Sequence, residues 1–148
     1  MEHMIDVEPR RAGLLRSSVF AGGFLAAHGA IHALLLNAPR PDGGAGNFLT
    51  RAGESALLGP LGMGDAGVEV LGTALALIAA AGFVLSGLAI LGGVRVPQRR
   101  AVLLGSAAAS LLMTALFWND WMVAAPVIDL AIVAALLRTA PSAMEAST

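Results

Sequence analysis

The chain has 148 residues, of which 57% are hydrophobic and 13% are charged, whereas an ordinary soluble domain has about 25% charged residues. It contains no cysteine, which excludes disulfides, thiolate metal sites and cysteine nucleophiles. A net charge of −1 at pH 7 excludes the basic surface that nucleic-acid binding requires. With a mean hydropathy of +0.77, the composition predicts a small integral membrane protein whose main partner is the lipid bilayer.

Four stretches are long and apolar enough to be predicted as membrane-spanning helices, because a span needs about 20 apolar residues. They cover residues 17–38, 68–94, 101–118 and 121–138. A soluble bundle would need a polar face on every helix, yet residues 70–94 contain only Thr73 and Ser86 as polar side chains. The predicted fold class is all-α, an antiparallel, up-and-down transmembrane four-helix bundle that forms a single domain over residues 1–148.

The segments outside the spans are predicted as tails and loops. Residues 1–12 and 141–148 are interpreted as solvated tails. The first span is interpreted as a retained helix, because its apolar part is longer than that of a signal peptide. The outer loop, residues 39–67, opens with a turn-forming run and contains a predicted short amphipathic helix over residues 47–58. This loop is interpreted either as a lid or as a cover of the bundle.

The nine basic residues are all arginines, and their distribution predicts the orientation. Two of them, Arg40 and Arg51, lie in the outer loop. The other seven fall on the opposite side of the predicted spans: Arg10, Arg11, Arg16, Arg95, Arg99, Arg100 and Arg138. Because positive residues stay on the cytoplasmic side, both termini are predicted in the cytoplasm, with the protein in a bacterial plasma (inner) membrane.

A few ionisable residues remain inside the predicted spans, where a charged group costs about 2.5 to 3.5 kcal/mol. At about 1.5 Å of rise per residue, His28 lies about 13 Å and His32 about 7 Å below the outer end of the first helix. Asp129 lies about 12 Å below the start of the fourth helix, and Glu69 lies about one turn inside the second. His28 and His32 are four residues apart and share a helical face. We therefore predict that these four side chains converge in the outer half of the bundle.

Three interpretations of this cluster stay open. In the first, it is structural: His28 hydrogen-bonds to Asp129, and His32 pairs with Glu69 or with loop carbonyls. In the second, His28, His32, Asp129 and Glu69 are metal ligands, and a divalent metal such as Zn²⁺ or non-haem iron is the candidate cofactor. In the third, the cluster handles protons or performs acid–base chemistry on a lipophilic substrate. No nucleotide-binding loop occurs, so no organic cofactor is predicted, and no catalytic residue is assigned.

Small residues and one proline predict how the helices pack. Pro126 leaves the Met122 carbonyl without its helical donor, which predicts a kink near Asp129. Small residues recur at a spacing of four on three of the spans, which allows close helix approach. These residues are Gly22 and Ala26 on the first span, Gly82 and Ser86 on the second, and Ser106, Ser110 and Thr114 on the third. A surplus stripe would face a second copy of the chain or a partner membrane subunit.

Short motifs resemble those of a family of small four-helix integral membrane proteins of actinobacterial-type bacteria. They are His-Gly-Ala-Ile-His at residues 28–32, the entry to the second span at residues 64–72, and Trp-Asn-Asp-Trp at residues 118–121. The chain departs from that pattern at residues 37–41, where Asn-Ala-Pro-Arg-Pro replaces an aromatic segment. The resemblance implies a four-span membrane protein and no particular activity.

The predicted function follows from the cluster and the membrane setting. We predict a non-enzymatic accessory protein, or one that handles small molecules or protons through its polar intramembrane cluster. The alternative is a membrane-embedded enzyme, metal-dependent or acid–base, that acts on a lipophilic substrate.

Overall fold

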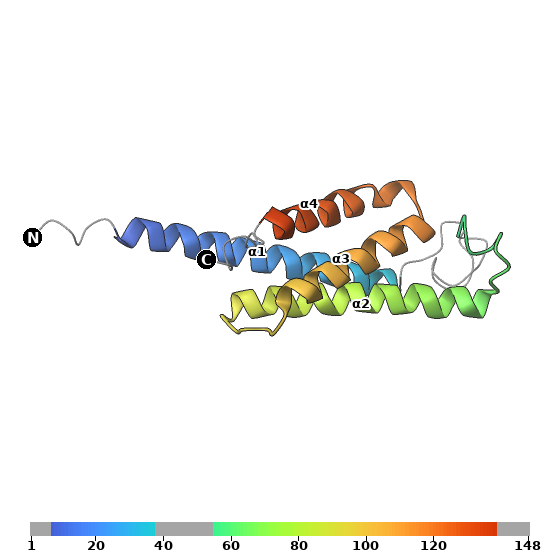
Figure 1. Ribbon diagram of the computed structural model, residues 1–148, viewed down its shortest axis with the longest axis horizontal. Coiled ribbons are helices and arrows are strands. Elements are labelled where there is room, and N and C mark those ends of the chain that lie inside the picture. Colours follow the sequence, from blue (N-terminus) through green and yellow to red (C-terminus); the bar gives the residue numbers. More distant parts are fainter. Residues whose placement is uncertain (1–6, 38–54, 139–148) are drawn as a thin grey trace, which may run out of the picture.

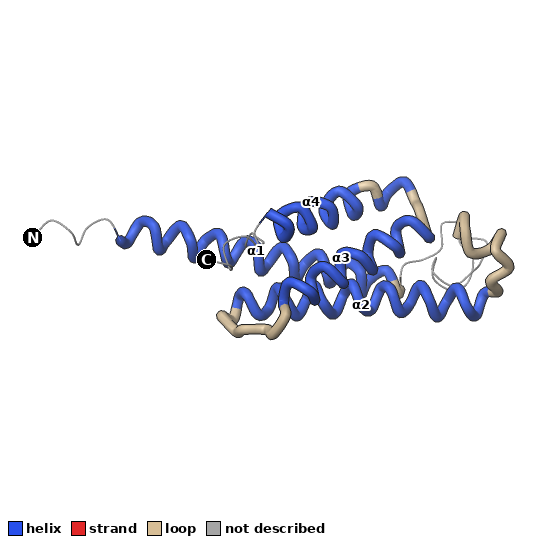
Figure 2. Tube along the Cα trace, in the orientation of Figure 1, coloured by secondary structure: helices blue, strands red, loops and turns tan. Residues whose placement is uncertain are grey.

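The computed structural model describes residues 7–37 and 55–138, and every regular element within these ranges is helical (Figures 1 and 2). The α-helices are α1 (Val7–Leu35), α2 (Asp65–Leu91), α3 (Arg99–Leu116) and α4 (Ala124–Arg138). A short 3-10 helix, η2 (Asp120–Met122), precedes α4. The all-α class is therefore confirmed for the described part of the chain.

Three of the described helices are long and apolar enough to cross a membrane. They are Ser17–Leu35 within α1, all of α2 and all of α3. The fourth, α4, has 15 residues and is about 22 Å long, which is shorter than the hydrocarbon core of about 30 Å. Length and composition thus support a membrane protein with three candidate spans, where four were predicted.

The first helix begins earlier than the sequence predicted. Residues 1–12 were expected to form a solvated tail, yet α1 already starts at Val7. Pro9 falls in the first helical turn, where its missing N–H has no intrahelical partner to lose, so it does not prevent the helix from starting. In Figure 1 the N-terminal part of α1 projects beyond the other helices.

The helices contact one another in chain order, α1 with α2, α2 with α3, and α3 with α4. Their buried side chains include many small residues, together with the large aromatic ring of Phe83 on α2. Large apolar side chains face outward: Phe20, Val70 and Leu130 expose 75%, 71% and 57% of their surface. An interior of small residues inside an apolar exterior suits a bundle that is surrounded by lipid.

The α1–α2 contact is close because glycines face backbone atoms of the other helix. A Cβ atom built on Gly87 would lie 2.5 Å from the Ala26 nitrogen and 2.6 Å from the Gly22 oxygen. A Cβ on Gly29 would lie 2.8 Å from the Val84 nitrogen. The stripe of Gly22 and Ala26 therefore packs against α2, as predicted.

The last helix differs from the prediction at its start. It begins at Ala124, not 121, so Pro126 lies in the first turn, where no helical hydrogen bond is lost and no internal kink follows. All of α4 is described, and Asp129 is its one buried residue, with Ile132, Val133 and Leu136 half-buried against the core. The amphipathic helix predicted over residues 47–58 lies mostly outside the described residues, and residues 56–62 form turns.

Candidate functional site

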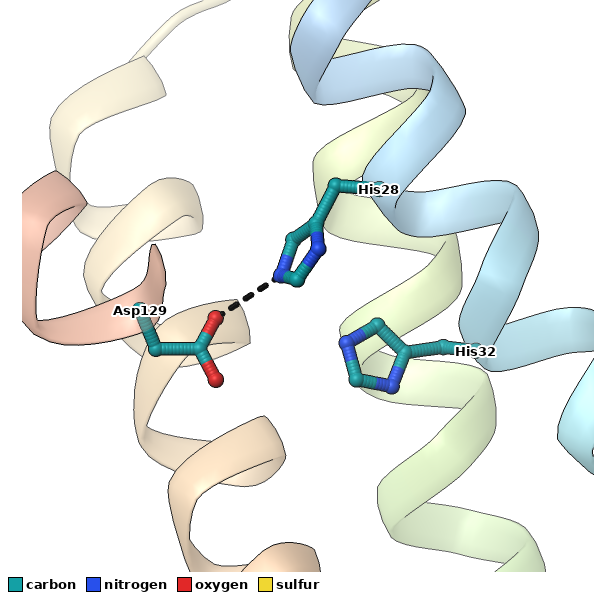
Figure 3. A group of neighbouring side chains, drawn as sticks. All are labelled: His28, His32 and Asp129. Atoms are coloured by element: carbon teal, nitrogen blue, oxygen red, sulfur yellow. Dashed lines mark hydrogen bonds and ion pairs between the residues drawn. The ribbon is translucent and has the colours of Figure 1, made fainter. Parts of the chain in front are cut away.

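Three of the four predicted polar residues meet in the interior. His28 and His32 lie one turn apart on α1, and Asp129 faces them from α4 (Figure 3). They expose 5%, 2% and 0% of their surface, and one potential ligand atom of each lies within 4.8 Å of the others. A ring nitrogen of each imidazole points toward the carboxylate (Figure 3). The convergence that was expected from helical rise is confirmed for these three residues.

Glu69 does not join this cluster. Its side chain is exposed, whereas the neighbouring Val68 is fully buried, so Glu69 lies on the outer face of α2. The first turns of α2 also extend past the end of α1 (Figure 1), and the group of neighbouring ligand atoms contains His28, His32 and Asp129 without Glu69. The prediction that four side chains converge is therefore wrong for this residue.

Ser110 on α3 takes the place that Glu69 was expected to fill. Its hydroxyl donates to Asp129 Oδ2 and lies 3.1 Å from His32 Nε2. The spacing of small residues had predicted Ser110 only as part of a packing stripe. The available signal was that Ser106, Ser110 and Thr114 put three hydroxyls on one helical face, although spacing alone does not show which of them reaches a charged partner.

With Asp129 as a carboxylate, the hydrogen bonds of the cluster follow one direction. The Asp129 carboxylate accepts from His28 Nε2–H, with 2.9 Å between Nε2 and Oδ1, and it also accepts from the Ser110 hydroxyl. Because Ser110 has a single proton and donates it to Asp129, its oxygen must act as the acceptor for His32. His32 Nε2 therefore carries a proton and donates it. The order of donation runs from His32 to Ser110 to Asp129, with His28 donating from the other side.

This direction leaves one nitrogen without a partner. His32 Nδ1 is buried and has no hydrogen-bond partner among the described residues. In a neutral imidazole whose Nε2 is protonated, Nδ1 is a lone-pair acceptor. Leaving such a group buried and unsatisfied costs about 1–3 kcal/mol, so a donor supplied to this nitrogen would be bound favourably.

Phe83 of α2 holds the two imidazole rings from a further side. Its ring centroid lies 4.8 Å from that of His28, in an edge-on arrangement, and 6.0 Å from that of His32, nearly parallel. The two imidazoles are 5.0 Å apart and almost perpendicular. Aromatic contact restricts both rings, while the polar groups of α3 and α4 fix their nitrogen edges.

A cavity of about 190 Å³ borders both imidazoles between α1 and α4. Apart from His28 and His32, its lining is apolar: Ile31, Leu35, Met122, Ala124, Ala125 and Ile128. A cavity of this composition suits a small apolar molecule with one polar group that faces the histidines.

The cluster combines a carboxylate, a hydroxyl and two imidazoles, which are groups that can accept, donate and pass protons along hydrogen bonds. The nitrogens and the carboxylate oxygens are also the donor types that Zn²⁺ binds. Comparison of the chain with protein-family models, with curated proteins and with solved structures finds no match.

Proposed function

We propose that the protein binds a small lipophilic molecule in the cavity between α1 and α4 and passes a proton from it to Asp129. The observations that carry this proposal are the hydrogen bonds that link His32 through Ser110 to Asp129, the unpartnered Nδ1 of His32, and the apolar cavity that the His32 residue lines. The bound molecule would carry a weakly acidic hydroxyl of the phenol type, which donates to this nitrogen.

The proton transfer balances along the chain. As the proton of the ligand bonds to His32 Nδ1, the Nε2–H bond of the same ring breaks and its proton moves to the Ser110 oxygen. The original Ser110 proton moves to Asp129 Oδ2. The ligand becomes an anion and the carboxylate becomes neutral, while His28 keeps its hydrogen bond to Oδ1 and orients the carboxylate. Serine and both rings return to their neutral states, so only the ligand and Asp129 change charge.

The membrane setting forms part of the same proposal. We infer four antiparallel passes, the last of which includes η2 and α4, and we place both termini in the cytoplasm of a bacterium. Membership of the four-helix family resembled by the sequence motifs would fit this topology. Reporter fusions at the two termini test the orientation, and an external C-terminus would overturn it.

The binding step is tested with 4-nitrophenol, because its anion absorbs visible light and its neutral form does not. At a pH below its ordinary pKa, we expect the purified protein in detergent to increase the anion absorbance. Ile128→Trp, which fills the cavity, should abolish this increase. Val127→Trp is the matched control, because Val127 is 65% exposed and does not line the cavity. Equal signals from both variants would refute binding at this site.

The relay step is tested with serine variants of α3. Ser110→Ala removes the link between His32 and Asp129, so nitrophenol should still bind but the anion should not form. Ser106→Ala is the control, because the Ser106 hydroxyl donates only to the Val102 carbonyl among the described groups. Undiminished anion formation by Ser110→Ala would contradict the relay and leave only a binding cavity.

A membrane-embedded enzyme with a metal centre is the second candidate, favoured by the three donor groups within 4.8 Å. A Zn²⁺ ion would replace the Nε2 protons and leave a coordination position for a lipophilic substrate. It would also require His32 Nδ1 to carry a proton with no described acceptor, whereas metal-bound histidines almost always donate that proton. Titration with Co²⁺ tests this candidate: stoichiometric visible absorption that disappears in His28→Ala and His32→Ala would favour the metal centre over the relay.

A further inference from the structure

A second and larger cavity, of about 480 Å³, lies where the α2–α3 connection meets the end of α4. Three arginines line it: Arg95, Arg99 and Arg100. Val96 and Pro97 of the connection also line it, together with Leu103 from α3, which is buried, and Leu136 from α4, which is half-buried. The cavity therefore joins a strongly positive wall to an apolar floor.

The positive charge of this wall is not neutralised by the acidic side chains that the structure describes. The buried Asp129 carboxylate pairs with His28. Asp65 and Glu69 lie at the opposite end of α2, and its 27 residues separate the two ends by about 40 Å. Three guanidinium groups around one hollow, with no carboxylate partner among the residues that the structure describes, form a site for an anion.

The start of α3 adds to the positive potential of the same cavity. Gln98 is the N-cap residue of α3 and has a φ of 52°, and its side chain makes no capping hydrogen bond. The first-turn N–H groups of a helix have no intrahelical acceptor and favour a nearby negative charge. This effect supports the arginines and would not form a site without them.

We propose that this cavity binds the phosphate group of an anionic membrane lipid. The guanidinium groups would hold the phosphate oxygens in paired hydrogen bonds, and the glycerol and the first acyl carbons would lie over Leu103 and Leu136. Inorganic phosphate offers the same anionic oxygens but cannot use the apolar floor, which is why the cavity favours a lipid. The proposal does not depend on the cluster of His28, His32 and Asp129.

The test uses the full chain in detergent, titrated with phosphatidylglycerol, phosphatidylcholine and inorganic phosphate, with bound lipid counted by native mass spectrometry. We expect phosphatidylglycerol to bind more tightly than phosphatidylcholine and to resist millimolar phosphate. At about fivefold for each guanidinium lost, the double variant Arg99→Gln with Arg100→Gln should bind phosphatidylglycerol about 25-fold more weakly. Arg138→Gln, which removes an arginine that does not line the cavity, should leave binding unchanged.

Three results would overturn the proposal. Equal affinity for the two lipids would mean that the headgroup charge is not recognised. Full competition by inorganic phosphate would assign the arginines to free phosphate and not to lipid. An equal loss in Arg138→Gln would mean that general electrostatic attraction, and not this cavity, retains the lipid. Retained helical circular dichroism in each variant separates these results from misfolding.

Discussion

Ser110→Ala should destabilise the protein far more than the same substitution at other buried serines. The change removes the donor to Asp129 Oδ2 and the acceptor of His32 Nε2–H, so two buried polar groups lose their partners at once. Each unsatisfied group costs about 1–3 kcal/mol. The expected loss in the free energy of unfolding is therefore about 2–6 kcal/mol.

Two other serines provide internal controls for this estimate. The Ser106 hydroxyl donates to the Val102 carbonyl one turn earlier, so Ser106→Ala should cost about 0.5–1.5 kcal/mol, the net value of one ordinary hydrogen bond. Ser86 is fully buried, and its hydroxyl has no hydrogen-bond partner among the described residues. Ser86→Ala removes an unpaired polar atom, and we expect it to be neutral or slightly stabilising.

The assay is equilibrium unfolding of the three variants in mixed micelles with increasing dodecyl sulfate, followed by helical circular dichroism. The expected order of stability loss is Ser110, then Ser106, then Ser86. If Ser110→Ala and Ser106→Ala lose equal stability, the hydrogen bonds from Ser110 to α1 and α4 do not exist as described. A large loss in Ser86→Ala would mean that this hydroxyl has a partner.

Four further substitutions test helix packing and backbone conformation by the same assay. Gly22→Ala should destabilise by about 1–3 kcal/mol, because its Cβ would lie 2.9 Å from the Gly87 oxygen. A Cβ atom on Gly23 would meet open space, so Gly23→Ala should stabilise the protein by up to about 1 kcal/mol through helix propensity. Equal effects of Gly22→Ala and Gly23→Ala would contradict the close α1–α2 contact. Phe83→Ala should lower the free energy of unfolding by about 3–5 kcal/mol. It should also broaden the ¹⁵N resonances of the histidines, and unchanged resonances would mean that the Phe83 ring does not restrain the imidazoles. Gln98→Gly should stabilise by about 1 kcal/mol by relieving a left-handed φ of 52°, and any loss would show that the glutamine side chain has a structural role.

The sequence was sufficient to predict the depth of His28, His32 and Asp129 along their helices. It was not sufficient to predict that Ser110 hydrogen-bonds to two of them. Helical rise is constant, so His28 and Asp129 could be placed at equal depth, and their atoms are 2.9 Å apart. The depth of Ser110 depends on how α3 crosses α1 and α4, and local pattern does not determine a crossing angle. Glu69 was misplaced because it lies on an exposed face of α2, and the apolar pattern of that helix did not show which face turns toward α1.

Helix boundaries were the other source of error. The composition of residues 1–12 suggested a tail, but proline is tolerated in a first turn, and α1 starts at Val7. The apolar run from residue 121 suggested one uninterrupted helix, whereas the 3-10 helix η2 and Val123 precede α4. Both errors concern the ends of helices, where capping and tertiary contacts decide between conformations of similar energy.

The single buried residue of α4 has a consequence for the conformational equilibrium of the bundle. Two hydrogen bonds to the Asp129 carboxylate anchor this helix, and bonds to a charged group contribute about 1.5–3 kcal/mol each. Together they favour the docked helix over a separated one by about 10²- to 10⁴-fold. A proton delivered to Asp129 would neutralise the acceptor of both bonds. The occupancy of the separated state would then rise with each proton transferred, so that ligand chemistry and helix displacement are thermodynamically linked.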